Sequence, residues 1–393
     1  MVIYLDYAAA TPVLREAVQA FQKLSTEVYG NSSSLHDAGG TSESILHYCR
    51  MKLAEMMSGE AEGIYFTSGG TESNFLAVQS ILKGLPSGKR HFLMTEMEHQ
   101  SMHILKRYLA ELGYEVGVMK PDASGIITTD ILKRHLRPDT GLVSIQHANS
   151  ETGVIQPLAE LSAFLHERDV LLHSDAVQTF AKIPVSVEQL GVDALSVSSH
   201  KVYGPKGTGA VYIRPGVNWK PAYPGTLHEN GFRNGTVNVP GIGAFITAAE
   251  RTVSGMDAVL EKHQKLRSYF FRGLRERRLP ISSAVPDSPQ LQVLPHILGC
   301  FFHSYEGQYV MLECNRRGIC ISTGSACSAG YHEPSNTMKA LRIPREQALQ
   351  FIRISFGSDT SKEHIDQLLD VFEAMNHEKG DHRIDRRSKT HGK

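Results

Sequence analysis

The chain has 393 residues, of which 41% are hydrophobic, and its 41 Lys plus Arg balance its 41 Asp plus Glu. With no net charge, no overall field favours nucleic acid or a membrane surface, and no apolar run approaches the roughly 18 residues of a spanning helix. The N-terminus lacks the basic head and apolar segment of a secretory signal, and five scattered cysteines argue against a disulfide framework. We therefore expect a soluble, cytoplasmic protein with reduced thiols.

Short β-rich runs alternate with amphipathic helical segments between residues 60 and 215. Strands are expected at residues 63–67, 91–94, 115–118, 141–145, 170–173, 194–197 and 210–213. Between them lie segments such as 157–168, where leucine and phenylalanine recur at helical spacing. This alternation predicts an α/β fold with a seven-stranded, mostly parallel sheet, whose last strand could run antiparallel after a glycine-rich turn.

A long helical stretch at 239–277 leads into a region with a different pattern of expected strands and helices. There, strands are expected at 292–295, 300–302 and 351–356, and helices at 308–317 and 362–375. The pattern predicts a second, smaller α+β domain. The expected organisation is an N-terminal arm at 1–15 that joins the small domain, a large domain at 16–254, the small domain at 255–376 and a disordered polar tail at 377–393.

Two charged residues stand at the ends of apolar runs. Asp175 closes the run 170–175, and Lys201 follows the run 193–197. A lysine at the end of a buried strand is costly, because burial disfavours its charged form, unless it is wanted uncharged or covalently used. The pair suits a pyridoxal phosphate enzyme, in which the carboxylate keeps the pyridine nitrogen protonated and the lysine holds the aldehyde as an imine.

Small residues at 67–74 lie between an expected strand and a helix that begins near Phe75. Backbone N–H groups there can approach an anion, and a helix N-terminus favours negative charge. The segment lacks the Gly-Lys-Ser/Thr ending of a nucleotide P-loop, and a tight turn with a helix cap would explain it without a ligand. Its place upstream of Asp175 and Lys201 favours a phosphate site.

Further polar residues follow the expected strands. His99 and His103 are four apart and could share a helix face and bind zinc, but no third ligand is identifiable. His99 could instead be a structural residue, or could stack on a flat cofactor and move protons near neutral pH. Asn149 and Gln178 could cap turns or donate hydrogen bonds to a cofactor or substrate. Ligands gather in open α/β sheets at the carboxyl ends of strands, where we expect residues 68–71, His99, Asn149, Asp175 and residues 198–201.

Two residues of the second domain have open roles. Cys327 lies in a Gly-, Ser- and Ala-rich segment typical of an exposed loop, whereas the other four cysteines resemble small buried hydrophobes. Its thiol could be a nucleophile or an inert surface group, since the segment offers no cation to lower its pKa. Arg353 sits in an apolar strand and needs an anionic partner, either a structural salt bridge or a substrate carboxylate.

Taken together, these motifs resemble the class V aminotransferase family, specifically the NifS/IscS-type (group I) cysteine desulfurases. The resemblance runs from residue 4 to about residue 375; residues 198–207 look like the cofactor-lysine motif and residues 324–327 like the nucleophile motif. It implies an aspartate-aminotransferase-like fold, a homodimer and pyridoxal 5'-phosphate as the cofactor. The implied reaction removes sulfur from L-cysteine, giving L-alanine and a persulfide on Cys327 for transfer to an acceptor protein.

The resemblance also assigns roles to single positions. Lys201 would bind the cofactor covalently, His99 would stack on its ring, and Cys327 would accept sulfur. The other cofactor contacts would come from Gly70, Thr71, Ser198 and His200 at the phosphate, Asp175 at the pyridine nitrogen, Gln178 at the phenolic oxygen, and Thr236, which would reach the neighbouring subunit's phosphate. Asn149 and Arg353 would hold the substrate carboxylate. No resident metal is implied, although Cys327 could ligate a cluster transiently.

The chain departs from the family in one loop. Family members often carry a glycine run before His-Glu-Arg-Gly, where this chain has Thr226, Leu227 and Asn230. The departure bears on loop flexibility and on the acceptor that docks nearby, which could be an iron–sulfur scaffold, a tRNA-thiolating enzyme or a dedicated cluster enzyme such as one in NAD biosynthesis. A selenocysteine lyase or another class V aminotransferase is the alternative enzyme, and a non-catalytic binding module is the alternative outside catalysis.

Overall fold

The computed structural model describes residues 2–225, 227–324 and 333–390, with side chains as far as residue 377. The chain forms two compact units. The larger comprises Ala10–Asn149 and Val154–Asp257, and the smaller comprises Met1–Ala9, Ser150–Gly153 and Ala258–Lys393. The arm that joins the smaller unit thus ends at Ala9 instead of residue 15, and a short insertion at 150–153, which the sequence pattern did not predict, also belongs to that unit.

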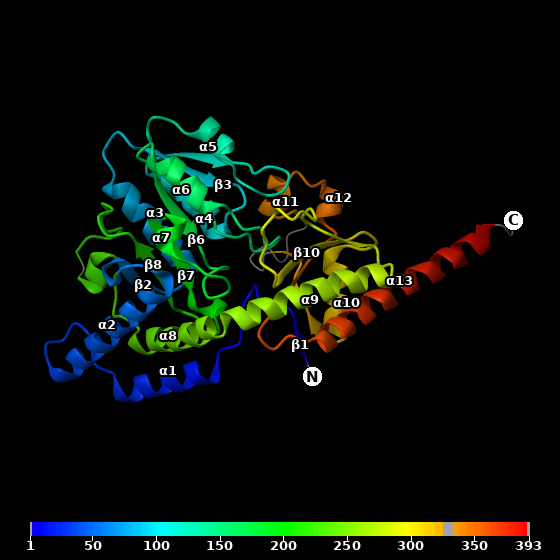
Figure 1. The fold of residues 1–393 in the computed structure, drawn as a ribbon, viewed down its shortest axis with the longest axis horizontal. Helices are drawn as coiled ribbons and strands as arrows, with labels where there is room; N and C mark the ends of the chain where they lie inside the picture. The colour runs from blue at the N-terminus through cyan, green and yellow to red at the C-terminus, as the bar shows by residue number, and fades with distance from the viewer. Residues whose placement is uncertain (1, 226, 325–332, 391–393) are drawn as a thin grey trace. The chain divides into compact units, whose positions relative to one another are not determined.

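The larger unit is built on a seven-stranded sheet in the order β2-β8-β7-β6-β5-β3-β4 (Figure 1). Its strands are β2 (Ile64–Thr67), β3 (His91–Thr95), β4 (Glu115–Met119), β5 (Thr140–Ser144), β6 (Leu171–Asp175), β7 (Ala194–Ser198) and β8 (Gly209–Ile213). β3 to β7 pair in parallel, whereas β8 runs antiparallel to both β2 and β7. The predicted sheet, with its antiparallel last strand, is confirmed.

Most strands of this sheet are buried along their whole length. They are buried because helices cover the sheet, as is usual for parallel strands. The helices of this unit are α1 (Arg15–Glu27), α2 (Asp37–Met57), α3 (Gly70–Gly84), α4 (Gln100–Glu111), α5 (Thr129–His135), α6 (Leu158–His166), α7 (Val187–Leu190) and α8 (Val239–Ser254). α3 contacts β5 to β8, and α6, the helix expected at 157–168, contacts β6. None of the helices in the described part of the chain is long and apolar enough to cross a membrane.

The described residues of the smaller unit form two small sheets. β1 (Ile3–Tyr4) pairs in parallel with β11 (Ile319–Cys320), and β10 (Ile297–Phe302) lies between the antiparallel strands β9 (Ile281–Ser283) and β12 (Phe351–Ser355). Its helices are α9 (Met256–Glu276), α10 (Gly307–Arg316), α11 (Asn336–Ala340), α12 (Arg345–Ala348) and α13 (Lys362–Thr390). The single helix expected at 239–277 is therefore two, separated at Gly255.

Two predictions for the smaller unit are wrong. Residues 292–295 form no strand: Leu294 donates its N–H to the carbonyl of Gly153, and Pro295 has no N–H to contribute to a ladder. The tail from residue 377, expected to be disordered, continues α13 as far as Thr390. Its glutamate, lysine and arginine residues favour helix, and it contains no proline.

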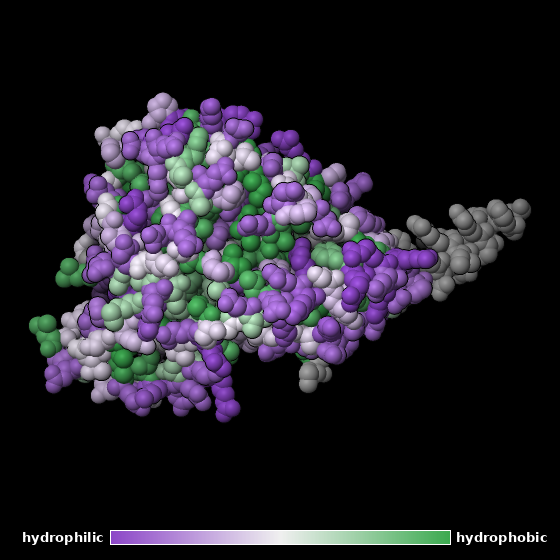
Figure 2. Space-filling model, viewed as in Figure 1, coloured by the Kyte–Doolittle hydropathy of each residue, from purple (hydrophilic) through white to green (hydrophobic). Residues whose placement is uncertain are grey.

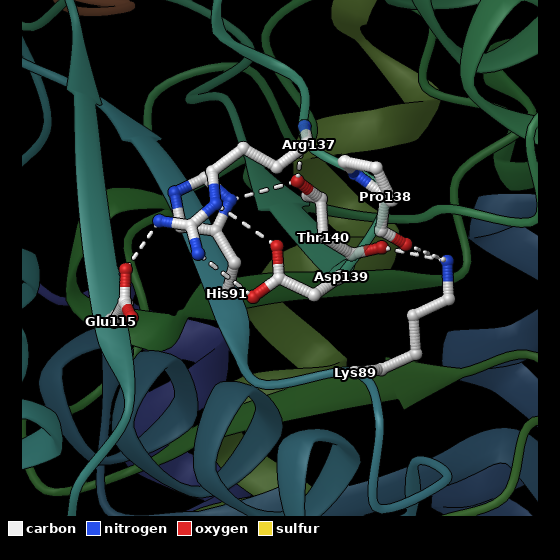
Figure 3. Close-up of polar contacts among 7 residues, drawn as sticks. All are labelled: Lys89, His91, Glu115, Arg137, Pro138, Asp139 and Thr140. Atoms are coloured by element: carbon white, nitrogen blue, oxygen red, sulfur yellow. Dashed lines mark hydrogen bonds and ion pairs between the residues drawn. The ribbon is translucent and has the colours of Figure 1, made fainter.

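At the amino ends of β3, β4 and β5, a group of charged side chains lies in solvent (Figure 3). Arg137 pairs with Glu115 and, through two hydrogen bonds of 2.9 and 3.0 Å, with Asp139. The ring of His91 bonds the hydroxyl of Thr140 at 2.7 Å. These contacts connect the starts of three neighbouring strands at the sheet edge opposite to the predicted site.

Candidate active site

Asp175 ends β6 and is held from two sides. Its Oδ2 accepts a hydrogen bond of 2.7 Å from the side-chain amide of Asn74 on α3, and its Oδ1 accepts one of 3.0 Å from the backbone N–H of Val177. Only 8% of the residue is exposed. The carboxylate is thereby fixed at the carboxyl end of the sheet, in a position suited to hold a protonated ring nitrogen.

Lys201 ends the short 3-10 helix η2 (Ser199–Lys201), which directly follows β7. The backbone N–H and the hydroxyl of Thr11 both donate to the carbonyl of His200 at 3.0 Å. The hydroxyl oxygen of Thr11 also accepts a hydrogen bond of 2.8 Å from the N–H of Tyr203. Tyr203 has a φ of 62°, a conformation that residues with side chains rarely adopt. Thr11 therefore fixes the backbone on both sides of Lys201.

A second amine lies close enough to Lys201 to interact with it electrostatically. The Nζ of Lys182 sits 4.6 Å from the centre of the Tyr203 ring, within range of a cation–π contact. Burial, together with the positive charge of Lys201, lowers the pKa of Lys182 to about 7. Two amines in one buried region disfavour each other's charged forms, which is one way in which proteins keep a lysine reactive.

The turn before α3 packs closely against the start of β8, as a backbone turn that binds an anion can do. Gly69 has a φ of 144°, and α3 begins at Gly70. A Cβ on Gly209 would lie 2.7 Å from the Cα of Gly69, so the start of β8 tolerates no side chain against this turn. The hydroxyl of Ser198 lies next to the same turn and contacts Nδ1 of His200 at 2.9 Å. Burial, aided by nearby lysines, lowers the pKa of His200 to about 4.

His99 follows β3 and caps the N-terminus of α4. Its Nδ1 accepts a hydrogen bond of 3.2 Å from the backbone N–H of Ser101 and contacts the Ser101 hydroxyl at 2.9 Å. Burial lowers the pKa of His99, opposed by Asp175 and reinforced by Lys201, so all three groups share one region. His103 points elsewhere, since its Nε2 contacts the carbonyl of Glu96 at 3.1 Å. The two histidines therefore have separate partners, and no group of three potential metal ligands occurs among the described residues.

Glu98, next to His99, joins the ends of two strands. Its Oε1 accepts hydrogen bonds from the Thr95 hydroxyl at 2.9 Å and from the backbone N–H of Gln146 at 2.8 Å. The residue is buried, and burial raises the pKa of the carboxyl to about 8. A neutral carboxylic acid at this position ties the end of β3 to the segment after β5.

The other residues predicted for the cofactor and substrate lie in several segments. Asn149 is buried after β5, and its amide donates to the carbonyl of Met97 at 3.4 Å. Gln178 is half-buried in the turn after β6, and Thr71 is exposed in the first turn of α3. Thr236 is exposed before α8. Asn149 and Gln178 thus share the carboxyl end of the sheet with Asp175, as predicted.

The loop that departs from the family is anchored at Glu229. Arg50 forms an ion pair of 2.9 Å with Glu229, whose carboxylate also accepts a hydrogen bond of 2.7 Å from the N–H of Phe66 on β2. Asn230 has a φ of 54°, and Leu227 is almost fully exposed. Thr226 lies outside the described residues.

In the smaller unit, Arg353 on β12 has the anionic partner that its burial requires. Its guanidinium pairs with Asp6 at 2.8 Å and donates to the carbonyl of Ser150 at 3.0 Å. Its Nε is buried without a partner in the described part of the chain. The salt bridge is therefore present, and a role in substrate binding stays a prediction. Cys327, the predicted sulfur acceptor, lies outside the described residues.

The larger unit fits pyridoxal phosphate by its donor set and its shape. A carboxylate, a lysine amine, an imidazole and a glycine turn at a helix N-terminus follow four strands of one sheet. A Cβ on Gly70 of that turn would lie 2.9 Å from Cγ2 of Val177. The sequence pattern missed the residues that support this set, namely Thr11, Asn74, Glu98 and Ser101. The signal for Asn74 is a polar residue on the buried side of α3.

Comparisons with known proteins agree with this geometry. The family model described as aminotransferase class-V matches residues 3–368. The NifS protein of Bacillus subtilis (strain 168) is 62% identical over 392 residues, which cover 100% of this chain and 99% of that protein. The cysteine desulfurase IscS of Dictyoglomus turgidum is 40% identical over 373 residues, covering 95% and 94%. A solved structure named NifS-like protein matches with a TM-score of 0.87 at 31% identity, covering 95% of this chain and 99% of its own.

The chain belongs to the class-V aminotransferase family, whose model matches residues 3–368. Within this family its place is among the NifS/IscS-type cysteine desulfurases. The predicted family, fold class and enzymatic nature are confirmed. The roles predicted for single site residues stay predictions.

Proposed function

We propose that the protein removes the sulfur of L-cysteine as a pyridoxal phosphate-dependent desulfurase, releases L-alanine and retains the sulfur as a persulfide on Cys327. The observation that carries the proposal is the Asp175 carboxylate, which two donors fix at the end of β6 while Lys201 follows the adjacent strand β7. An anion and an amine so placed complement the two ends of this cofactor's reactive system.

The cofactor, when bound, supplies a sink for the negative charge that develops at the substrate Cα. Lys201 would bind it covalently, and the free amine of Lys201 would take the Cα proton of the substrate on Nζ. Asp175 would keep the proton on the pyridine nitrogen. The phosphate would be bound by Gly70, Thr71, Ser198 and His200, and the substrate carboxylate by Asn149 and Arg353.

Sulfur transfer to Cys327 then needs no further oxidant or reductant. The Cys327 thiolate attacks the substrate sulfur, the new S–S bond forms, and the substrate C–S bond breaks. The electron pair of the broken bond goes to the substrate carbon, which takes up a proton and leaves as part of alanine. The substrate sulfur ends as the outer atom of a persulfide on Cys327, from which an acceptor protein removes it.

The proposed assembly is a homodimer. On the larger unit, α1, α2 and the segment between them expose a group of large hydrophobic side chains, namely Val18, Phe21, Tyr29, Leu35, Tyr48 and Met51. Figure 2 shows green, hydrophobic atoms on the surface of this region, at the lower left of the view. A second copy is the occupant that also explains the exposed Thr236, because that residue is expected to reach the phosphate of the neighbouring subunit.

We place the enzyme in the cytoplasm, where thiols stay reduced. Cys49, Cys300, Cys314 and Cys320 are all free, which supports such a compartment. The sulfur acceptor belongs to iron–sulfur cluster assembly or to a thio-cofactor or tRNA pathway. The exposed Leu227 offers one contact for an acceptor on the loop that departs from the family.

Incubation of the cofactor-loaded enzyme with L-cysteine tests the proposal, with alanine and protein-bound sulfur measured together. We expect equal amounts of both in the first turnover. Cys327→Ser should keep the visible absorbance of the bound cofactor and lose the persulfide, whereas Cys320→Ser is the matched control and should keep both products. Turnover that persists in Cys327→Ser would instead indicate a transaminase, and turnover only with selenocysteine would indicate a selenocysteine lyase.

A further inference from the structure

Four buried or half-buried side chains of the larger unit form one chain of hydrogen bonds. The Nδ2 of Asn74 donates to Oδ2 of Asp175 at 2.7 Å and to the hydroxyl of Ser101 at 3.0 Å. That hydroxyl contacts Nδ1 of His99 at 2.9 Å. Asn74 and Ser101 are 0% and 2% exposed, so solvent does not replace these contacts. The chain runs from β6 through α3 to α4 and joins the two side chains expected to contact the cofactor ring.

The direction of each hydrogen bond follows from what each group can donate. A carboxylate only accepts, so the amide nitrogen of Asn74 must face Asp175, and its second hydrogen goes to Ser101. The Ser101 oxygen accepts that hydrogen, which leaves its own proton for His99. The backbone N–H of Ser101 also points at Nδ1 of His99, at 3.2 Å. Two donors converge on Nδ1, so in the neutral ring this atom carries no proton.

We propose that Asn74 and Ser101 are positioning residues that fix the proton of neutral His99 on Nε2 and make this tautomer depend on the carboxylate of Asp175. The inference rests on the proposed function, because the same ring is expected to stack on the cofactor. It assigns acid–base exchange by His99 to Nε2, since Nδ1 is committed to Ser101. Buried networks that are oriented in this way hold a catalytic group in one protonation pattern.

This chain of hydrogen bonds from Asp175 through Asn74 and Ser101 to His99, called the relay below, lowers the stability of the fold for a reason that its geometry explains. The Oδ1 of Asn74 is buried and has no hydrogen-bond partner in the described part of the chain. A buried acceptor without a partner lowers the stability of the fold, and an apolar side chain of similar size would avoid this loss. Only an amide or another double donor can serve Asp175 and Ser101 together, so the unpaired oxygen accompanies the relay.

Nitrogen NMR of apoprotein labelled with 15N-histidine tests the tautomer directly, without any turnover. The chain has 19 histidines, and His99→Gln identifies the two ring resonances of His99 by their loss. Above neutral pH the ring is neutral, since burial lowers its pKa. We expect a bare Nδ1 and a protonated Nε2 in the wild type; a proton on Nδ1 would overturn the proposal.

Two variants test the connection. Ser101→Ala should shift the Nδ1 resonance toward that of a nitrogen without a side-chain donor, and Ser101→Thr should restore it. Asp175→Asn should reverse these hydrogen bonds. The N–H of Val177 keeps the new amide oxygen on its side, so the new amide nitrogen faces Asn74. Asn74 must then turn its oxygen toward residue 175 and Ser101, where it accepts the proton of the Ser101 hydroxyl.

Asp175→Asn should therefore produce the same Nδ1 shift as Ser101→Ala, and the double variant no further shift. Asp130→Asn, an equal change of charge on the exposed start of α5, is the control and should shift nothing. An unshifted His99 in Asp175→Asn would refute the relay. Because the spectra need no cofactor or sulfur release, failure of the relay and failure of the desulfurase proposal are separate results.

Discussion

At the amino ends of β3, β4 and β5, charged side chains pair with one another in solvent, as Arg137 does with Glu115 and Asp139 (Figure 3). At the carboxyl ends of the same sheet, polar side chains are buried, and several of their atoms have no partner in the described part of the chain. These atoms are Oδ1 of Asn74, Oε2 of Glu98, Nε2 of Gln146 and Oγ of Ser199.

The difference shows where the larger unit accepts a cost in stability. Exposed ion pairs contribute little and cost little, because water and salt screen them. Buried unpaired groups cost free energy that a fold normally avoids. Such groups gather around Asp175, His99 and Lys201, where pKa values are also shifted, and both features are typical of a functional site.

Replacement of the amine at the carboxyl end should have the largest effect. Lys201→Ala removes the amine that we propose to bind the cofactor and to move the Cα proton, so alanine production should fall by at least about 10²–10⁴-fold. The visible absorbance of the covalently bound cofactor should disappear as well. Lys220→Ala, at an exposed lysine of the same unit, should leave both unchanged. Covalent cofactor retained in Lys201→Ala would contradict the assignment of this site.

The stability of Glu98→Gln relative to the wild type should increase as the pH rises. Because burial raises the pKa of Glu98 to about 8, the folded protein holds a proton that the unfolded chain releases near pH 4.5. The contribution of the carboxyl to stability therefore falls by about 1.4 kcal/mol for each pH unit across this window, and an amide lacks this loss. Melting temperatures of the apoprotein from about pH 5 to about pH 8 measure the difference.

The matched control for this measurement is Glu62→Gln, at an exposed glutamate of the same unit. Its difference from the wild type should be constant over the same pH range. A constant difference for Glu98→Gln would mean that the buried carboxyl is ionised throughout, and that the carboxyl end of the sheet holds a second anion beside Asp175.

Gly209→Ala should weaken cofactor binding without touching a polar group. The new methyl would lie 2.7 Å from the Cα of Gly69 and 2.8 Å from the carbonyl of Val197, so the phosphate turn must move. Overpacking of this kind costs about 1–3 kcal/mol, and we expect the affinity for pyridoxal phosphate to fall about tenfold. Gly40→Ala, where nothing lies within 4 Å, is the control and should not change the affinity.

The sheet and the edge that carries the proposed site could be predicted because both depend on local patterns. Buried parallel strands read as continuous apolar runs, and the residue after each run falls at one edge. That Arg353 needs an anionic partner was predictable, but the identity of the partner was not, since Asp6 lies 347 residues away in the sequence and meets β12 through a bridge to Ser355. The prediction of a strand at 292–295 was wrong because the backbone N–H of Leu294 donates to the carbonyl of Gly153, a tertiary contact that the sequence does not show.

The relay of Asn74 and Ser101 could not be predicted for a related reason. Its members come from α3, α4 and β6, and which of their polar atoms meet depends on how these elements pack. Sequence spacing places polar residues at the ends of elements but does not choose their partners. Supporting residues of a site are therefore harder to predict than residues that contact the cofactor.

Arg137→Gln should have the smallest effect on function. It tests the difference between the two ends of the strands by a change at their amino ends. Its ion pairs are exposed, so we expect the melting temperature to change by about 1 °C or less and cofactor affinity and turnover to stay the same. The variant should still be detectable, because Arg137 helps burial to lower the pKa of His91, and its removal should raise that pKa in an NMR titration. If cofactor affinity instead fell as in Gly209→Ala, the strands would transmit changes from one end to the other. The amino end would then be part of the site, and not the inert edge that its solvent-exposed pairs indicate.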